Sequence, residues 1–317
     1  MYTNILVPLD GSPFAEAALP YAQWLAERGG AGLTLVRATR APISLGDAGS
    51  HERRAVAETE AYLTALAAEL VAHGFRVQTG VPYGGSAAGW IVEEVGMRHA
   101  DLVVMATHER TGPDRWLHGS VAEAVVGQAS APVLLIRAPS SPRAVERFRD
   151  QRPVLVVPLD GSSLAEAALP GAVTLARTLG GRILLVGVVP VPGQRVAIVG
   201  GEVAFVGAEH TQLINETRGY LAGMVDRLAA TRLPAEALVC QGEPAEGIAE
   251  AAGAHNAAAV VMATHGLTGL ARTVMGSVAG EVLHRTACPV LLVRSIRPER
   301  SHVEVPVGVE AVGQAAR

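Results

Sequence analysis

The chain contains no lysine, so all 26 of its basic side chains belong to arginine. This absence excludes several mechanisms, whatever its origin in genome composition. There is no lysine to bind phosphates as in a P-loop, to form a Schiff base, or to fill the lysine position of a protein kinase.

Aromatic residues and cysteines are scarce as well. Aromatics make up 4% of the chain and the net charge is −4, so neither a base-stacking surface nor a basic footprint for nucleic acid is present. The two cysteines, Cys240 and Cys288, are far apart and lie in or beside apolar runs. We expect free, buried thiols there, since the spacing fits neither a disulfide framework nor a metal site.

Long apolar runs are also missing, and no stretch is long enough to span a membrane. The first residues lack the basic-then-apolar pattern of a signal peptide. We therefore expect a cytoplasmic protein without a membrane or nucleic-acid partner. With 317 residues, 49% of them hydrophobic, the chain is large enough for two domains that each bury a core.

The sequence repeats itself once. The segment NILVPLDGS at 4–12 matches VLVVPLDGS at 154–162, and AEAALP occurs at 15–20 and again at 165–170. A repeat of this length indicates a duplicated domain. We assign the first repeat to residues 1–138, a Pro/Ser-rich and then charged linker to 139–152, the second repeat to 153–297, and a loose polar tail to 298–317.

Each repeat contains five short β-branched runs separated by helical patterns. They lie at 5–8, 33–37, 76–79, 102–106 and 133–136 in the first repeat, and at 154–157, 183–188, 237–240, 259–263 and 290–293 in the second. This alternation predicts α/β domains, each with a five-stranded parallel sheet and right-handed crossovers through helices on both faces.

Start and stop signals predict the helices. Ser12 followed by Pro13 is an N-cap with proline at the first helical position, and Gly29–Gly30 ends this helix. Pro20 and Pro170 predict either a kink or a helix that begins late. Long helices are expected near 52–73 and 209–230. The Gly/Pro-rich segment 190–207 between them is either a lid or a surface insertion.

Three loops of each repeat should meet at the carboxyl ends of the strands, where open parallel sheets bind ligands. The first carries Asp10 or Asp160, which can accept hydrogen bonds from a sugar or base edge or can simply form a turn. The second places Ala38 or Val188 as an apolar wall or as core packing.

The third loop is rich in glycine and runs from the fourth strand into a helix. In the second repeat Gly266 and Gly276–Ser277 are separated by nine residues. Free backbone N–H groups and the positive end of the helix dipole make such a loop an anion site. Arg272 follows in this loop, as Arg115 does in the first repeat, and either could bridge to phosphate or be a solvated surface arginine.

The first repeat keeps Gly119–Ser120 but has Glu109 in place of Gly266. A carboxylate there repels phosphate, so we expect weak binding or none in that repeat. His108 and His265 follow the fourth strands, but neither triad nor metal-ligand spacing accompanies them. We expect them to anchor the loops.

Each repeat resembles a universal stress protein domain, through P-x-D-G-S, D-L-V-V-M-A-T-H, G-S-V-A and C-P-V-L-L-V-R, over residues 1–137 and 152–296. The resemblance implies a Rossmann-like fold of the adenine nucleotide alpha hydrolase type. It also implies dimerisation through the last strand. In this tandem chain, 133–136 could pair with 290–293 as an internal pseudo-dimer that covers two sheet edges, and a homodimer is possible too.

Members of this family that bind ATP carry the loop G-2x-G-9x-G-[S/T]. The second repeat reads Ala263, Gly266, Gly276 and Ser277 at these positions and so differs only in the first glycine, whereas the first repeat has lost two. The resemblance implies a nucleotide site formed by Pro158, Asp160, Val188, Met262, Ala263, Gly266, Gly276, Ser277 and Val278, with weaker counterparts at Asp10, Gly119 and Ser120.

The sequence thus predicts a stress-response protein that binds ATP, with Mg²⁺ as a plausible counter-ion, mainly in the second repeat. It would act as a sensor or regulator with at most slow hydrolysis. The glycine losses leave open a protein-interaction module that binds no nucleotide. An adenylyl transferase or pyrophosphatase-type synthase on a related scaffold is disfavoured, because His-x-Gly-His and Ser-Gly-Gly-x-Asp-Ser are absent.

Overall fold

The computed structural model of the chain describes residues 1–39, 48–82, 85–108, 120–138, 145, 152–191, 198–199, 202–203, 207–265 and 275–295. The elements of the first repeat are β1 (Asn4–Pro8), α1 (Pro13–Glu16), α2 (Leu19–Gly29), β2 (Gly32–Val36), α3 (Ala48–Ala72), β3 (Val77–Gly80), α4 (Ala87–Met97), β4 (Leu102–His108), α5 (Ser120–Gln128) and β5 (Val133–Ala138). Those of the second repeat are β6 (Val154–Pro158), α6 (Ser163–Glu166), α7 (Leu169–Leu179), β7 (Arg182–Val189), β8 (Ile198–Val199), β9 (Glu202–Val203), α8 (Gly207–Ala229), β10 (Ala235–Gln241), α9 (Pro244–Ala254), β11 (Ala259–His265), α10 (Ser277–Arg285) and β12 (Val290–Ser295).

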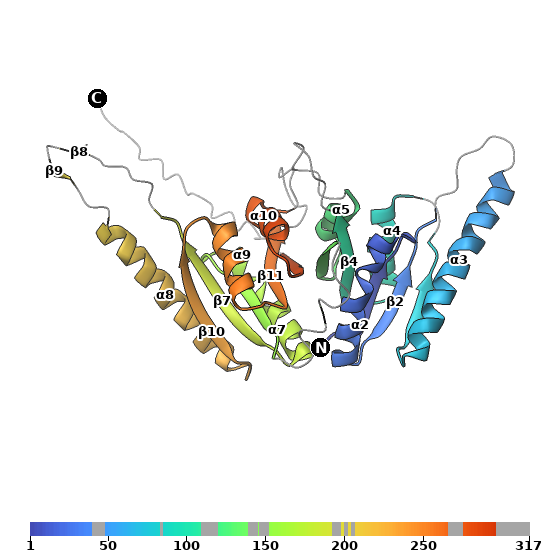
Figure 1. The fold of residues 1–317 in the computed structure, drawn as a ribbon, viewed down its shortest axis with the longest axis horizontal. Helices are drawn as coiled ribbons and strands as arrows, with labels where there is room; N and C mark the ends of the chain where they lie inside the picture. The colour runs from blue at the N-terminus through green and yellow to red at the C-terminus, as the bar shows by residue number, and fades with distance from the viewer. Residues whose placement is uncertain are drawn as a thin grey trace, which may run out of the picture.

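The predicted α/β architecture is confirmed. Within each repeat all neighbouring strands of the main sheet are parallel, but the two sets join into one ten-stranded sheet of order β10-β7-β6-β11-β12-β5-β4-β1-β2-β3 (Figure 1). The strand order reverses between β6 and β11, and again between β1 and β4. These two switch points are where open parallel sheets leave room for ligands.

The repeats meet through their last strands. β5 and β12 pair antiparallel, with Leu135 opposite Val290 and Leu134 opposite Leu291. Two arginines cross this junction in opposite directions. The Arg294 guanidinium donates to the Gln128 carbonyl at 3.3 Å, and that of Arg137 donates to the carbonyl of His284. Each arginine therefore binds the last turn of the other repeat's helix, α5 or α10, where helix carbonyls lack internal partners.

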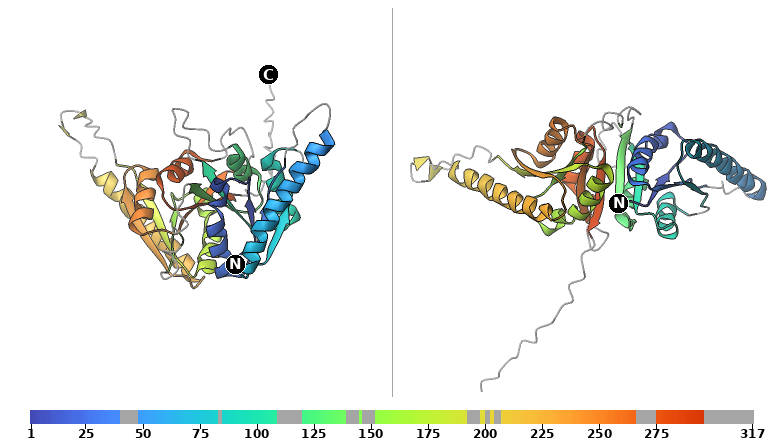
Figure 2. Two further views of the ribbon diagram at one scale, coloured as in Figure 1. Left: turned by 45° about the vertical axis from the view of Figure 1, so that its right-hand side comes forward. Right: turned by 90° about the horizontal axis from the view of Figure 1, so that it is seen from below.

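Apolar side chains form one layer on each face of the sheet. Since strand side chains alternate between faces, Ile5 and Val7 belong to one layer and Leu6 to the other. The first layer packs under α2, α3, α7 and α8, and the second under α4, α5, α9 and α10. Both layers run through both repeats, with α3 and α8 at the two outer ends of the molecule (Figures 1 and 2).

The start of each repeat shows why its first helical segment is broken. Ser12 caps α1, its hydroxyl accepting from the Ala15 N–H at 3.1 Å, and Pro13 follows as the first helical residue. α1 ends at Glu16, and Pro20 then lies in the first turn of α2, where a missing N–H costs nothing. Of the two predicted outcomes at Pro20, the late start is therefore the correct one. Gly30, with φ of 69°, ends α2 in the left-handed region.

The long helices agree with prediction within a few residues, since α3 begins four residues before 52 and α8 two before 209. The short β8–β9 pair lies inside the segment 190–207, most of which is outside the described residues, as are most of the linker and the tail. No helix in the described part of the chain has the length and apolar character needed to cross a membrane.

Candidate functional site

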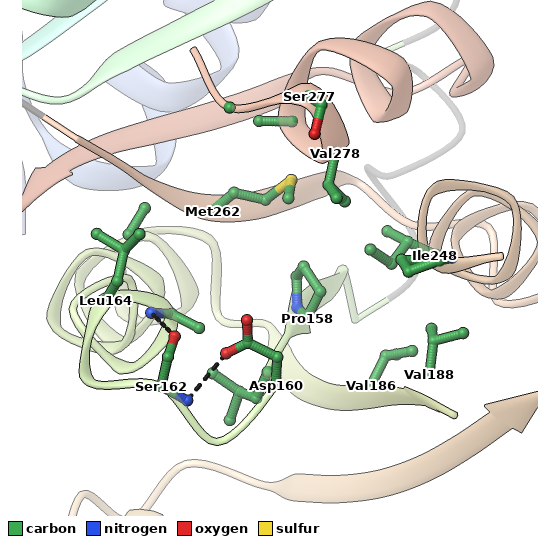
Figure 3. Close-up of a pocket in the computed structure, with 16 residues that line it drawn as sticks. Pro158, Asp160, Ser162, Leu164, Val186, Val188, Ile248, Met262, Ser277 and Val278 are labelled. Carbon is green, nitrogen blue, oxygen red and sulfur yellow. Dashed lines mark hydrogen bonds between the residues drawn. The ribbon is translucent and has the colours of Figure 1, made fainter. Parts of the chain in front are cut away.

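A cavity of about 300 Å³ lies at the switch point of the second repeat, between the carboxyl ends of β6 and β11 (Figure 3). Eight of the nine residues predicted for the second-repeat site line it, although they come from four separate parts of the chain. They are Pro158, Asp160, Val188, Met262, Ala263, Gly276, Ser277 and Val278. The ninth, Gly266, lies outside the described residues.

The loop after β6 gives Asp160 two roles. Its Oδ1 accepts from the Ser162 N–H at 2.9 Å, which makes the turn, and Gly161 adopts a φ of 83° that favours glycine. Ser162 then caps α6 by accepting from the Ala165 N–H at 3.1 Å. Asp160 is also exposed and lines the cavity, and Oδ2 takes no part in the turn bond. The turn-forming and ligand-facing interpretations are therefore compatible.

Apolar side chains close one side of the cavity. Val186 and Val188 come from the end of β7, and Ile248 faces them from α9 (Figure 3). No motif in the sequence assigned α9 to the site, although Gly-x-Pro at 242–244 repeats Gly-x-Pro at 80–82. Gly247 allows the helix to approach the strand, since a Cβ there would lie 3.1 Å from Val188 Cγ1.

The opposite side is the beginning of α10. Gly276 is the N-cap residue, and a Cβ at this position would have no atom within 4 Å. Ser277, the first helical residue, is exposed at the cavity. The first N–H groups of a helix have no partner within it, and the helix dipole adds partial positive charge. This end can hold an anion, while the other end offers a carboxylate and apolar walls.

A tyrosine fixes α8 against α6 beside this cavity. The Tyr220 hydroxyl donates to Glu166 Oε1 at 3.1 Å, and Arg227 donates to Glu166 Oε2, also at 3.1 Å. Burial, followed by the charge of Glu166, raises the pKa of Tyr220 to about 12. The same pair recurs in the first repeat, where Tyr62 donates to Glu16 at 2.6 Å and its pKa is likewise raised, mainly by burial.

This pairing predicts a loss of stability in alkali. A tyrosine pKa above its unfolded value, near 10, means that the folded state favours the neutral phenol. The stabilisation is complete below about pH 10 and is lost as the pH rises to about 12. We expect the free energy of unfolding, measured in urea at stepped pH, to fall across that interval. Tyr220→Phe should flatten part of the fall, and an identical slope in this variant would contradict the assignment.

The first repeat has a corresponding cavity of about 350 Å³ at its own switch point, lined by Asp10 among others. Asp10 Oδ1 accepts from both the N–H and the hydroxyl of Ser12, at 2.8 and 2.5 Å. Ser120 begins α5, but its side chain, like Glu109 and Gly119, lies outside the described residues. The predicted weakness of this site therefore stays a prediction.

The other candidate residues are two histidines and two cysteines. His108 and His265 end β4 and β11, and their side chains lie outside the described residues. Within the described parts of the chain, no three His, Cys, Asp or Glu side chains come together as a metal site would require. Cys288 is buried, and Cys240 is a half-buried free thiol whose pKa is raised by burial.

Comparison with known proteins agrees with this architecture. A universal stress protein of Thermus aquaticus is 34% identical over 142 residues, which are 44% of this chain and 97% of that protein. A universal stress protein of Mycobacterium bovis is 31% identical over 201 residues, but this match spans only 62% of either chain. The crystal structure of a universal stress protein from Archaeoglobus fulgidus shares the fold over 92% of this chain and 98% of its own, with a TM-score of 0.67 and 19% identity.

The family model also supports a duplicated domain. The model of the universal stress protein family matches residues 1–137 and 152–294, which together are most of the chain. The two matches correspond to the two sets of parallel strands that join at β5 and β12. The chain therefore belongs to the universal stress protein family, and it carries two copies of the family's domain in tandem.

Proposed function

We propose that this protein binds ATP in the cavity of the second repeat and acts as a nucleotide-dependent sensor or regulator in a stress response. One observation carries the proposal. Residues from β6, β7, β11 and α10, more than 100 positions apart at the extremes, surround a single cavity at a strand-order switch point. The end formed by the start of α10 can bind an anionic phosphate, and the other end offers the Asp160 carboxylate and apolar side chains to a ribose and a base.

The cavity suits the parts of a nucleotide. A volume of about 300 Å³ is at the small end of ligand pockets and suits a nucleoside. The apolar wall of Val186, Val188 and Ile248 would contact the base, and Asp160 would accept from a ribose hydroxyl. Gly276 and Ser277 would bind phosphate through backbone N–H groups and a hydroxyl. Mg²⁺ would be held chiefly by phosphate and water, as this ion prefers.

Turnover should be slow at best. The chain has no lysine, and the described residues around the cavity include no histidine that could act as a base. Binding without rapid hydrolysis fits a sensor better than an enzyme. Observed turnover faster than about one per second, the low end of ordinary enzymes, would instead favour the enzyme hypothesis.

We also propose that the two repeats form an internal pseudo-dimer. The antiparallel β5–β12 pairing and the exchanged arginines, Arg137 and Arg294, support a two-fold arrangement of the repeats. In this arrangement each repeat protects the other's edge strand from further pairing.

The direct test is to denature the freshly purified protein and to identify any released nucleotide by chromatography and mass. About one ATP per chain is the expected result. Two per chain would show that the first repeat binds ATP as well, contrary to the effect predicted for Glu109. No nucleotide, and no uptake of added ATP, would favour the interaction-module alternative.

Asp160→Asn separates the turn from the ligand contact. The amide oxygen can still accept from the Ser162 N–H, but an NH₂ group that cannot accept a hydrogen bond replaces Oδ2. We expect ATP affinity, measured by calorimetry, to fall about tenfold, which corresponds to about 1.4 kcal/mol. Asp226→Asn, on the exposed surface of α8, is the control. Equal affinities of the two variants would exclude Asp160 from the site.

A further inference from the structure

The ten-stranded sheet has two outer edges, and β10 forms the longer of them. Among the described residues, β10 is the terminal strand of the sheet and pairs with β7 alone, beside α8 at the outer end of the second repeat (Figure 1). It contains no proline, and its charged residue, Glu236, is paired with Arg182 at 2.9 Å. Such edges are usually covered or blunted, because their N–H and C=O groups readily pair with another strand.

The hydrogen bonds to β7 show which backbone groups of β10 face outward. The Ile183 N–H donates to the Pro234 carbonyl at 2.9 Å, and the Gly242 N–H donates to the Val189 carbonyl at 3.0 Å. Since backbone groups point alternately to the two sides of a strand, the even-numbered residues of β10 direct theirs toward β7. The odd-numbered residues, 235 to 241, therefore direct their N–H and C=O groups away from the sheet.

The two faces of β10 belong to different apolar layers. Ala235 and Val239 pack against the layer under α8, whereas Leu238 and Cys240 pack against the layer under α9. The residues with outward-facing backbone groups are thus the ones whose side chains lie on the α8 face. A strand added to this edge would continue both layers.

The helix α8 presents an apolar surface toward the same edge. Its Tyr220 and Arg227 reach inward to Glu166 of α6. The opposite side of the helix, which helical spacing turns toward the open edge, carries Ala222, Val225 and Ala229. Both alanines are exposed and the valine is half-buried. Apolar side chains of an added strand could cover this α8 surface.

A segment of the same chain has the pattern of a partner strand. Within the polar tail, residues 303–311 read VEVPVGVEA, so valine occupies every second position from 303 to 309. This alternation is typical of a strand with one apolar face. Proline fits an edge strand only where the backbone N–H would point to solvent. Pro306 therefore requires that the odd-numbered residues of the tail direct their backbone groups to the neighbouring strand.

The tail and β10 match in this alternation. In an antiparallel pair, residues directly opposite each other place their side chains on the same face of the sheet. The odd-numbered tail residues would lie opposite the odd-numbered residues of β10, and the valines would then lie on the apolar α8 face. A shift by one residue would place Pro306 in the ladder and the valines on the other face.

The connection from β12 is long enough for this pairing. Ser295 ends β12 at the same end of the sheet as Gln241 ends β10, because the main-sheet strands of this repeat are parallel. A strand added outside β10 lies five strand spacings from β12, about 24 Å, and sheet twist lengthens the path. Residues 296–305 span about 33–36 Å when extended, but residues 296–303 span only about 26–29 Å. This reserve favours the register in which Val305 lies opposite Gln241.

The edge formed by β3 is a poorer template. This strand has four residues, and the same alternation leaves two of them, Val77 and Thr79, with backbone groups facing outward. A strand outside β3 would also lie six spacings from β12. The β10 edge therefore offers more hydrogen bonds over a shorter path.

We propose that residues 305–311 of the tail pair antiparallel with β10 of the same chain as an eleventh strand of the sheet. Val305 lies opposite Gln241, and the two valines that follow contact the α8 surface. Pro306 lies opposite Cys240, where its missing N–H faces solvent and prevents further pairing. This goes beyond the function proposed above and does not depend on nucleotide binding.

Disulfide trapping tests the pairing in the full chain. Pro306→Cys, oxidised with glutathione disulfide, should form a bond to Cys240, because opposite residues of a non-hydrogen-bonded pair have Cα atoms about 4.5 Å apart, within disulfide range. Val307→Cys is the matched control, since its side chain faces α8. Peptide mass spectrometry should find the link at least tenfold faster in the first variant. Equal rates, or a link that joins two chains, would overturn docking within the chain.

Hydrogen exchange measured by mass spectrometry gives an independent readout. Deletion of residues 298–317 should speed exchange in the peptide 235–241 at least tenfold and leave the peptide 77–80 unchanged, because only β10 loses a neighbouring strand. In the full chain, Val307→Pro removes a paired N–H and should act like the deletion. Gly308→Pro removes an N–H that faces solvent and should preserve the protection. Exchange of β10 that is insensitive to the deletion, or equal effects of the two prolines, would refute the pairing.

Discussion

Gly276→Val is expected to abolish nucleotide binding by the second repeat. Gly276 lies at the N-cap of α10 on the cavity wall, and a Cβ there would point into open space rather than into protein. The valine side chain would occupy the volume where phosphate must approach the first N–H groups of the helix. We expect ATP affinity to fall at least about 100-fold, which corresponds to about 2.8 kcal/mol.

The folded structure should tolerate this change. The φ and ψ of Gly276, −59° and 155°, are open to any residue, and the loss of a glycine cap costs about 1 kcal/mol or less. Gly223→Val, on the exposed surface of α8 and also free of neighbours within 4 Å, is the matched control. Calorimetric titration with ATP and thermal melting should be done on both. Retained affinity in a folded Gly276→Val protein would refute the site.

Leu135→Ala is expected to cause the largest loss of stability. Leu135 is fully buried in β5, directly opposite Val290 of β12, so its side chain lies where the two repeats join. Truncation of a buried leucine removes its transfer free energy and leaves a cavity that the two paired strands can fill only partly. The free energy of unfolding should fall by about 2–5 kcal/mol.

Urea denaturation measures this effect directly. The control is Leu213→Ala, since Leu213 is 49% exposed and its truncation should change stability by no more than about 0.5 kcal/mol. The slope of the transition should be unchanged in both variants if only stability is affected. A Leu135→Ala protein as stable as the control would mean that the β5–β12 junction contributes little to the fold.

The junction contacts the two helices whose beginnings line the cavities. Arg294 binds the end of α5 and Arg137 binds the end of α10, the helix whose beginning lines the second-repeat cavity. Each repeat therefore contacts the carboxyl end of a helix whose amino end faces the other repeat's switch point.

Much of the fold could be predicted because its signals are local. Ser12 followed by Pro13 starts a helix, and Gly30 ends one, through bonds within a few residues of each position. The alternation of β-branched runs with helical patterns predicts parallel sheets. The handedness of each crossover can then be predicted as well, because it is nearly invariant. The strand-end rule gave Asp160, Val188, Gly276 and Ser277, and the family resemblance implied the other four of the eight residues that line the cavity.

The rest depended on contacts between residues remote in sequence. Packing across the sheet decides whether Pro20 kinks a helix or starts one, and whether Ile248 reaches the cavity. The sequence by itself determined the duplicated α/β domains and the loops that carry the candidate site. The sequence offered a pairing of the last strands, but only the tertiary structure showed that they do pair within the chain, antiparallel, and so join the two sheets. Only the tertiary structure also decided which side chains line each cavity, because side-chain volumes are matched in space and not along the chain.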